Sequence, residues 1–245
     1  MDENVKKLGF GIALVVILAF HAGAQQYCHE SDFRIEPINR GRSVRITEYV
    51  GDNFEVRIPP RINNLPVTQI GGNAFAGRNL TSVTIPDGVV SIGNSAFANN
   101  QLDNVTIPDT VTFIGQQAFA WNKLTRVIIP NSVTIIGQQA FANNHLDNVS
   151  IPNSVTSIGE FAFAWNKLTS LTIGNGVTSI GGVGAFYENP LVNVTIGNNV
   201  HIASESWGGA IICLIGSGFY GFYIAQGRRA GYYTFSGGQW RVRFR

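Results

Sequence analysis

The chain has 245 residues, of which only 13% are charged, about half of the usual share for a soluble domain. This length fits one domain or one elongated array of repeats. The formal net charge of +2 points to no particular class of partner and gives no electrostatic case for nucleic acid.

Residues 1–24 have the pattern of an export signal. Lys6 and Lys7 precede a 13-residue apolar run, Leu8–Phe20, and Ala22 and Ala24 form an A-x-A cleavage site. The run is too short to span a membrane comfortably. No second long apolar run follows. We therefore expect a mature chain without a transmembrane segment, exported to the periplasm, the cell surface or the medium.

Residues 25–57 are expected to form an N-terminal cap on an array of repeats at 58–198. The repeat period is 22 residues, with a last step of 23. The motif IG-x-x-AF occurs at Ile70–Phe75, Ile92–Phe97, Ile114–Phe119, Ile136–Phe141 and Ile158–Phe163, and in a longer form at Ile180–Phe186. The motif L-x-x-[VL]-x-I begins at Leu80, Leu102, Leu124, Leu146, Leu168 and Leu191. Such a period is typical of a solenoid.

Each unit contains two short apolar segments separated by turns. Val83 and Ile85 alternate with the polar Ser82 and Thr84, which predicts a strand with one buried face. Proline ends this strand in most units, because it has no N–H to donate. The VTSIG segment is expected on the opposite wall, and the AF segment is expected to form a single helical turn with Phe in the core. No unit can bury its own apolar face, so the units must stack, each adding one strand to a parallel sheet.

One column of asparagines, at equivalent positions of successive units, lies three residues after each Phe. A chain that turns at every corner leaves backbone N–H and C=O groups without partners, and a buried Asn amide can pair with them along the stack. We expect this structural role. A ladder of polar ligand-binding groups is the weaker alternative. The column consists of Asn100, Asn122, Asn144, Asn166 and Asn189.

The pattern LxxVxIPxxVxxIGxxAFxxN, over about 58–198, closely resembles the BspA-like leucine-rich repeats, the spirochaetal class of that superfamily. The segment before it and the tail GFYIAQGRRAGYYTFSGGQW resemble the N-terminal cap and the C-terminal segment of such proteins. The resemblance implies a leucine-rich-repeat solenoid, a curved right-handed coil with a parallel sheet on one face and short strands and turns elsewhere. It also implies export or surface display, where several members act as adhesins for host proteins or other bacteria.

Residues 199–245 form an aromatic and basic tail, which has no acid after Glu205. An open solenoid end must be covered, so we expect a C-terminal cap of several short strands. A binding surface for an anionic polymer or a membrane surface is the alternative, and the two are compatible if the aromatic side chains pack inward and the arginines face water.

Nothing in the sequence predicts catalysis. Gly216–Gly221 matches G-x-G-x-x-G, but no helix pattern and no acid follow, so a dinucleotide site is rejected. His29, His145 and His201 are dispersed over different units, without the spacing of metal ligands. No G-x-S-x-G motif is present. We therefore expect a non-enzyme that needs no cofactor and no metal.

The connector after each Phe alternates between units. Trp121 and Trp165 occupy a position that is Asn at residues 99 and 143, and Lys123 and Lys167 follow two residues later. Neighbouring parallel strands lie about 4.8 Å apart, so we expect the two tryptophans about 10 Å apart on one edge, with the lysines in a matching row.

The outward positions of the predicted strands are mostly small and polar, except for Arg126 and Ile128 on one strand. Exposed Trp beside cations is typical of binding hot spots, which favours a contact ridge. The alternative is duplication of a 44-residue pair of units, in which Trp merely covers its neighbours. The predicted partner-binding residues are Trp121, Lys123, Arg126, Ile128, Trp165 and Lys167.

Together these features predict an exported solenoid that binds another macromolecule, in the first place as an adhesin or host-protein interaction module. Partners of that kind include host matrix proteins and other bacterial surface proteins, and nucleic acid is not expected. Two alternatives stay open: a periplasmic structural or scaffolding protein, and a glycan-binding module suggested by the spaced Trp pair.

Overall fold

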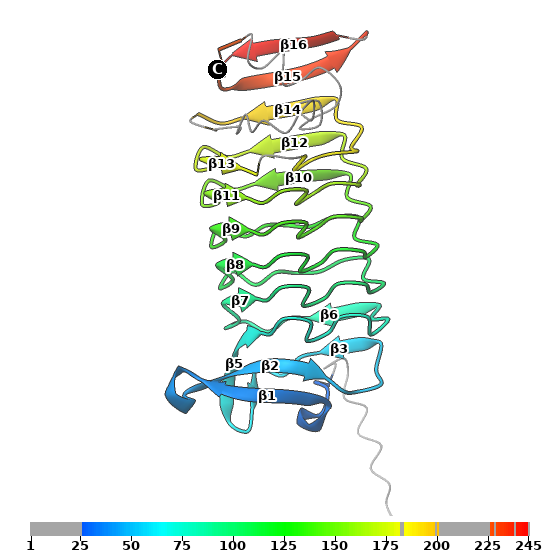
Figure 1. Ribbon diagram of the computed structural model, residues 1–245, viewed down its shortest axis with the longest axis vertical. Helices are drawn as coiled ribbons and strands as arrows, with labels where there is room; N and C mark the ends of the chain where they lie inside the picture. The colour runs from blue at the N-terminus through cyan, green and yellow to red at the C-terminus, as the bar shows by residue number, and fades with distance from the viewer. Residues whose placement is uncertain are drawn as a thin grey trace, which may run out of the picture.

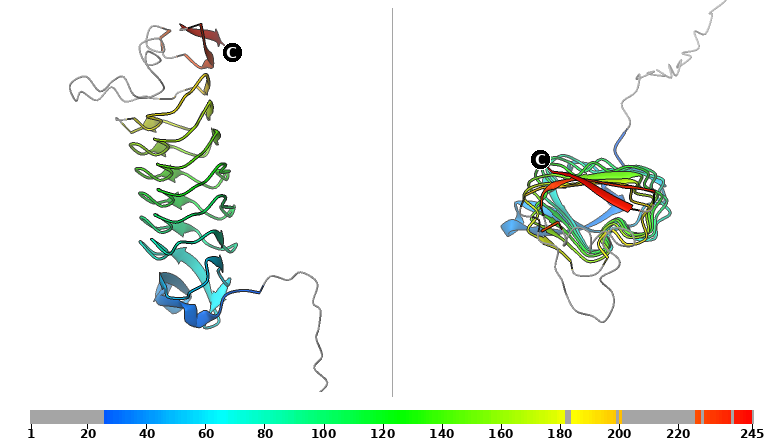
Figure 2. Two further views of the ribbon diagram at one scale, coloured as in Figure 1. Left: turned by 90° about the vertical axis from the view of Figure 1, so that its right-hand side faces the viewer. Right: turned by 90° about the horizontal axis from the view of Figure 1, so that it is seen from above.

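A computed structural model describes residues 26–181, 184–198, 200, 226–227, 229–237 and 239–244. The predicted export signal and the Gly216–Gly221 motif lie outside the described residues. The described chain is a β-solenoid of about seven coils, stacked along one axis with a hairpin at each end (Figures 1 and 2). Its helices among the described residues are two single 3₁₀ turns, η1 (Glu30–Asp32) and η2 (Asn39–Gly41). The predicted solenoid is thus confirmed.

The back wall is a nine-stranded sheet in the order β1-β2-β5-β7-β8-β9-β11-β13, with β4 beside β5. From β2 onward the neighbours along this path are parallel, and β1 is antiparallel to β2. The strands are β1 (Phe33–Ile38), β2 (Ser43–Tyr49), β4 (Arg61–Ile62), β5 (Leu65–Ile70), β7 (Ser91–Ile92), β8 (Phe113–Ile114), β9 (Ile135–Ile136), β11 (Ser157–Ile158) and β13 (Ser179–Ile180). The segment expected on the opposite wall therefore forms the longer ladder.

The front wall carries the strands predicted from the L-x-x-[VL]-x-I motif, in two separate sheets. One pairs β3 (Glu55–Arg57) with β6 (Ser82–Thr84) in parallel. The other has β10 (Asn148–Ile151), β12 (Ser170–Ile173) and β14 (Asn193–Ile196) in parallel, followed by the antiparallel β15 (Gly231–Ser236) and β16 (Gln239–Phe244). Residues 104–107 and 126–129 between them form no strand. The expected one strand per coil thus holds on the back wall and is interrupted on the front wall.

The AF segments form tight turns rather than the expected helical turns. In each one a backbone N–H donates to the carbonyl three residues earlier, as from Ala120 to Gln117 at 3.1 Å. The residue two positions before Phe has a left-handed φ, for example 56° at Gln117 and 54° at Phe161. A left-handed residue cannot continue a right-handed helix, so the chain turns the corner and leaves.

The phenylalanines of these turns form one continuous column in the core. Phe75, Phe97, Phe119, Phe141, Phe163 and Phe186 are fully buried, and neighbouring rings stack with centroids 5.0–5.5 Å apart. Tyr49 extends the column at the N-terminal end, 5.5 Å from Phe75, and Phe33 of β1 packs against both. The hairpin β1–β2 therefore closes the core at this end.

The asparagine column pairs with backbone groups of its own coil and of the coil before. Asn144 Nδ2 donates to the carbonyls of Phe119 at 3.0 Å, Phe141 at 3.1 Å and Ala142 at 3.3 Å, and its Oδ1 accepts from Leu124 N at 3.0 Å. The same set recurs at Asn100, Asn122, Asn166 and Asn189. All five asparagines are buried and their amides are paired with backbone groups. The predicted structural role is therefore confirmed, and the amides are not free to form a ladder of ligand-binding groups.

The glycine of each IG pair allows neighbouring coils to approach closely. A Cβ on Gly137 would lie 2.6 Å from both Gln116 N and the carbonyl carbon of Gly115. Contacts below 3.0 Å recur at Gly93, Gly115, Gly159 and Gly181. A side chain at these positions would push two coils apart, which explains why this column is invariably glycine within the chain.

The hairpin at each end covers the stack. At the N-terminal end the outermost strand β1 carries Pro37 and an irregular register after Arg34, two features that discourage further strand pairing. At the C-terminal end β15 adds to β14, and Tyr233 is fully buried while Arg241 and Arg243 are exposed. Both hairpins thus place apolar side chains on the core and charged or proline residues outside.

Candidate partner-binding surface

The front face, defined as the outer side of the front wall, alternates as the sequence predicts. Its inward residues are buried: Val83, Val105, Val127, Val149, Leu171 and Val194. Its outward residues are exposed or half-buried: Ser82, Thr84, Asn104, Thr106, Arg126, Ile128, Asn148, Ser150, Ser170, Thr172, Asn193 and Thr195. These outward side chains are small and polar in every coil except one. That coil is therefore the distinctive region of the front face.

That coil carries Arg126 and Ile128. The Ile128 side chain is 81% exposed, the highest value among the exposed large apolar residues that the structure describes. It borders a hollow of about 600 Å³ whose polar wall includes Asp109, Asn148 and Ser150. Arg126 is exposed beside it. The outward position that Ile128 occupies is Thr or Ser in the other coils, so the scaffold does not require an apolar side chain there.

The Trp edge, defined as Trp121, Lys123, Trp165 and Lys167, lies at the corner where each coil enters the front wall. The tryptophan side chains are 39% and 37% exposed. Both have a left-handed backbone, with φ of 55° at Trp121 and 54° at Trp165. The whole column shares this conformation: Gly77, Asn99, Asn143 and Glu188 have φ between 53° and 65°.

Glycine and asparagine suit a left-handed position, whereas a bulky residue there is an outlier that costs about 1–2 kcal/mol. The scaffold therefore explains the glycine and asparagines of this column and opposes its tryptophans. Strained residues of this kind persist where packing or function requires them.

The two tryptophans have different surroundings. Trp165 stacks on Phe161 with centroids 5.4 Å apart and meets Tyr187 edge-on at 5.7 Å. Among the described residues, Trp121 makes no ring contact of this kind, since Gln117 stands where Phe161 stands two coils on. Ring packing therefore explains in part why a tryptophan is present at position 165. It does not explain the tryptophan at position 121.

Cations accompany both tryptophans. Lys123 Nζ donates to Gln101 Oε1 at 3.0 Å, and Lys123, Lys167 and Arg126 are exposed. Within the described part of the chain none of the three forms an ion pair, and the ion pairs present join Arg34, Arg45 and Arg78 to Glu36 and Glu48 at the N-terminal end. These cations are consequently available to an acidic partner.

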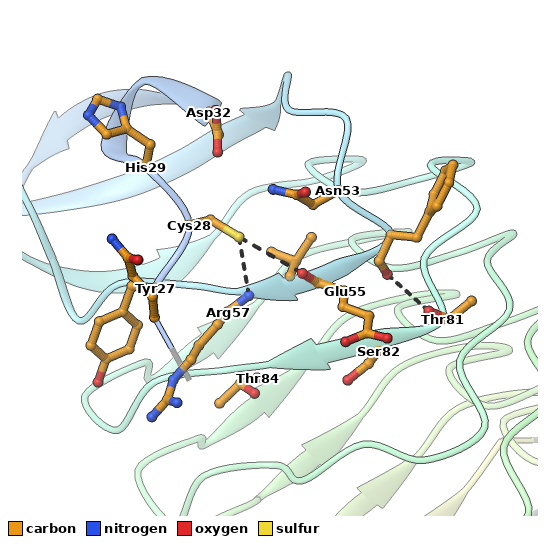
Figure 3. Close-up of a pocket in the computed structure, with 13 residues that line it drawn as sticks. Tyr27, Cys28, His29, Asp32, Asn53, Glu55, Arg57, Thr81, Ser82 and Thr84 are labelled. Atoms are coloured by element: carbon orange, nitrogen blue, oxygen red, sulfur yellow. Dashed lines mark hydrogen bonds between the residues drawn. The ribbon is translucent and has the colours of Figure 1, made fainter. Parts of the chain in front are cut away.

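A second hollow, of about 700 Å³, lies at the N-terminal end of the front face between residues 26–29 and the strands β3 and β6 (Figure 3). Cys28 lies along the free edge of β3: its N–H donates to Arg57 O at 3.0 Å, and its Sγ accepts from Arg57 N at 3.4 Å. The Arg57 guanidinium lies 4.7 Å from the centre of the Tyr27 ring. No sequence pattern predicts this hollow, because most of its residues belong to the irregular segment before the repeats.

Among the described residues, no cluster of His, Cys, Asp and Glu could hold a metal ion. Burial, followed by the nearby Cys28, raises the pKa of the Tyr49 hydroxyl, which donates to Asn53 O at 3.1 Å inside the N-terminal cap. That hydroxyl is part of the core, so it offers no acid or base to the front face.

A family model, the BspA type leucine rich repeat region, matches residues 68–192 in six copies, just over half of the chain. The chain belongs to the BspA-type leucine-rich repeat family. This confirms the resemblance read from the repeat pattern. No curated protein matches the sequence significantly.

Solved structures of three bacterial leucine-rich repeat proteins are similar to this BspA-type chain. The T. pallidum leucine-rich repeat protein is 27% identical, with a TM-score of 0.58 over 64% of this chain and 82% of that one. A leucine-rich cell surface protein of Faecalibacterium prausnitzii is 25% identical, with a TM-score of 0.51 over 90% and 61%. A Bacteroides ovatus leucine-rich repeat protein, 22% identical with a TM-score of 0.53 over 73% and 58%, supports the fold alone.

Leucine-rich repeats of this family typically act as protein-binding modules and not as enzymes. In the BspA-type chain, no helix among the described residues is long and apolar enough to cross a membrane. The structure places the six predicted partner-binding residues on two adjoining surfaces: Arg126 and Ile128 on the front face, and the other four on the Trp edge. The left-handed backbone and the ring cluster around Trp165 are the features that the sequence reasoning missed.

Proposed function

We propose that this chain is exported and binds another protein through the front face and the Trp edge, as an adhesin or host-protein interaction module. One observation carries the proposal. Trp121 and Trp165 remain exposed at left-handed positions where the chain otherwise uses mostly glycine or asparagine. Trp and Arg are the residue types most enriched among the side chains that dominate binding energy.

The neighbouring residues support this assignment. Ile128 and Arg126 follow Trp121 by a few residues in the same coil, so one partner could contact the Trp edge and the front face together. The lysines and Arg126 add positive charge that is not neutralised by ion pairs within the described residues. Such charges speed association with an acidic partner and orient it.

The test uses the mature chain, residues 25–245, as bait against purified matrix and serum proteins. A double variant, Trp121→Asn with Trp165→Asn, keeps the residue type that the chain itself places at Asn99 and Asn143. Phe113→Asn is the matched control, because it removes a ring of 37% exposure from the back wall. Binding should fall at least about tenfold in the double variant and stay unchanged in the control. Equal binding by both variants would refute the proposal.

We also propose the division of the chain into an export signal (1–24), an N-terminal cap (25–57), the repeat array (58–198) and a C-terminal cap (199–245). Cell-surface display is supported by the description of the F. prausnitzii neighbour as a cell surface protein. Protease treatment of intact cells tests it. Digestion supports the adhesin, whereas protection would favour a scaffolding protein inside the envelope.

A further inference from the structure

We propose that the Trp edge recognises a polyproline II segment that carries an acidic residue at every third position. The proposal rests on the proposed function above and specifies the chemistry of the partner. It follows from the spacing of the tryptophans, the shape of the surface between them and the charge beside them.

The spacing is set by the hydrogen bonds between coils. Trp121 N donates to Ala142 O at 3.0 Å, and Asn143 N donates to Ala164 O at 3.0 Å, so the two tryptophans stand two coils apart in register. Two coil spacings amount to about 10 Å. A polyproline II helix advances about 3.1 Å per residue with three residues per turn, or about 9.3 Å per turn. Successive turns would therefore present the same side chain to Trp121 and then to Trp165.

Other peptide conformations fit the Trp edge less well. An extended β-strand repeats a face every two residues, about 6.8 Å. Two turns of an α-helix, about 10.8 Å, match the Trp spacing about as well as one polyproline II turn does, so the helix is disfavoured by its width: its diameter of about 10–12 Å exceeds the single coil that separates the two indoles. The narrow polyproline II helix meets both limits.

The surface between the tryptophans suits a small ring. Asn143 occupies the intervening position of the same column and is half-buried, and because its side chain is shorter than the indoles of the neighbouring copies, we expect a trough between them. Proline-rich segments dock in grooves lined by aromatic side chains and lose little conformational freedom on binding, because polyproline II is already populated in the free peptide. A proline ring can occupy this trough while its neighbours face the indoles.

The charge beside the trough has the same two-coil period. Lys123 and Lys167 occupy one column and are exposed, with His145 between them. Among the nearby acids, Asp103 and Asp147 each accept a hydrogen bond at 2.6 Å from the following asparagine, Asn104 and Asn148. Glu160 lies seven residues before Lys167, and the exposed Glu188 follows Trp165 in the same column, so the positive stretch ends at Lys167. A peptide acid at every third residue would reach each lysine in turn, which selects acidic over basic proline-rich segments.

Calorimetric titration of the mature chain with three synthetic peptides tests the inference. The first repeats Pro-Pro-Glu, the second Pro-Pro-Lys, and the third Gly-Ser-Glu, which keeps the charge and lacks the conformation. The Pro-Pro-Glu peptide should bind at least about tenfold more tightly than either of the others. Equal binding of the Gly-Ser-Glu peptide would show attraction by charge alone and would overturn the proposal.

Variants locate the binding. Trp121→Asn should reduce affinity for the Pro-Pro-Glu peptide, and so should Asn143→Trp, which fills the trough while adding an aromatic ring. Lys123→Gln, the residue found one coil earlier at Gln101, should reduce the preference for Glu over Lys in the peptide. Phe113→Asn on the back wall should change nothing, and circular dichroism verifies that each variant is folded. Tighter binding of the Pro-Pro-Glu peptide by the Asn143→Trp variant would show that the peptide does not occupy a trough at Asn143.

An acidic oligosaccharide, polygalacturonate, serves as the competing ligand. If it binds with the same Trp dependence and the Pro-Pro-Glu peptide does not, the partner is a glycan and the inference is wrong. If neither binds while a matrix protein is captured in a Trp-dependent manner, the polyproline II inference fails and the proposed function stands. If the captured protein binds the Trp121→Asn, Trp165→Asn double variant as well as the unchanged chain, the proposed function is wrong.

Discussion

Replacing each tryptophan of the Trp edge by asparagine should have unequal effects on stability. Trp165→Asn is expected to lower the free energy of unfolding by about 1–3 kcal/mol more than Trp121→Asn does. The reason is that Trp165 contacts two rings, Phe161 and Tyr187, whereas Trp121 contacts none among the described residues. Each such aromatic pair contributes about 0.5–1.5 kcal/mol beyond the burial of area.

The comparison is informative because the other terms cancel. The two side chains have similar exposure, 39% and 37%, so their removal exposes a similar apolar surface. Both substitutions relieve a left-handed bulky residue, which is worth about 1–2 kcal/mol in each case. The stacked ring at 5.4 Å and the edge-on ring at 5.7 Å then remain as the difference.

Urea unfolding of the mature chain, followed by circular dichroism, measures this difference, provided that the slope with denaturant is unchanged between variants. The variant Phe161→Gln, which copies Gln117 and Gln139, completes a double-mutant cycle with Trp165→Asn. The cycle should give a coupling of about 0.5–1.5 kcal/mol. Equal destabilisation by the two Trp variants, or a coupling near zero, would refute the description of Trp165 as partly structural.

Three further substitutions test the scaffold and the front face. Asn144→Leu removes four hydrogen bonds to buried backbone groups and should lower the free energy of unfolding by about 4 kcal/mol, measured by urea unfolding. Gly137→Ala places a Cβ 2.6 Å from backbone of the preceding coil and should lower the melting temperature through a cost of about 1–3 kcal/mol. Ile128→Ser should leave stability within about 0.5 kcal/mol, since the side chain is 81% exposed, while partner binding measured by calorimetry falls.

Much of the fold could be predicted because, in a solenoid, residues one repeat period apart in the sequence are neighbours in space. Each residue lies beside its own copy in the next coil, so the Phe, Asn and Gly columns of the sequence are also columns in space. The asparagine column illustrates this. Its position three residues after Phe placed the amide at the corner, and Asn144 does pair with backbone of two coils there.

The features that escaped prediction break the period or depend on backbone conformation. The left-handed column around Trp121 had a signal, since Gly77, Asn99 and Asn143 occupy it, but the tryptophans concealed the shared conformation. Phe161 stands in a column that is Gln in the two coils before it. This change of residue type was the sequence signal for the ring cluster around Trp165. No sequence pattern predicted the N-terminal hollow, because the contact that forms it, from Cys28 to Arg57 of β3, joins segments outside the repeats.

Duplication of a pair of units and a binding ridge were the two explanations for the alternating tryptophans, and the structure bears on both. If Trp merely covered its neighbours, those neighbours should accompany it in both copies. Phe161 and Tyr187 support Trp165, whereas Gln117 and Ala142 occupy the corresponding positions beside Trp121. Trp and Lys thus agree between the two units although the rings beside Trp differ, whereas Arg126 and Ile128 of the first unit are Ser170 and Thr172 in the second. A contact ridge requires the Trp–Lys pair in both units and duplication does not, so binding by the Trp121→Asn, Trp165→Asn double variant decides between the two explanations.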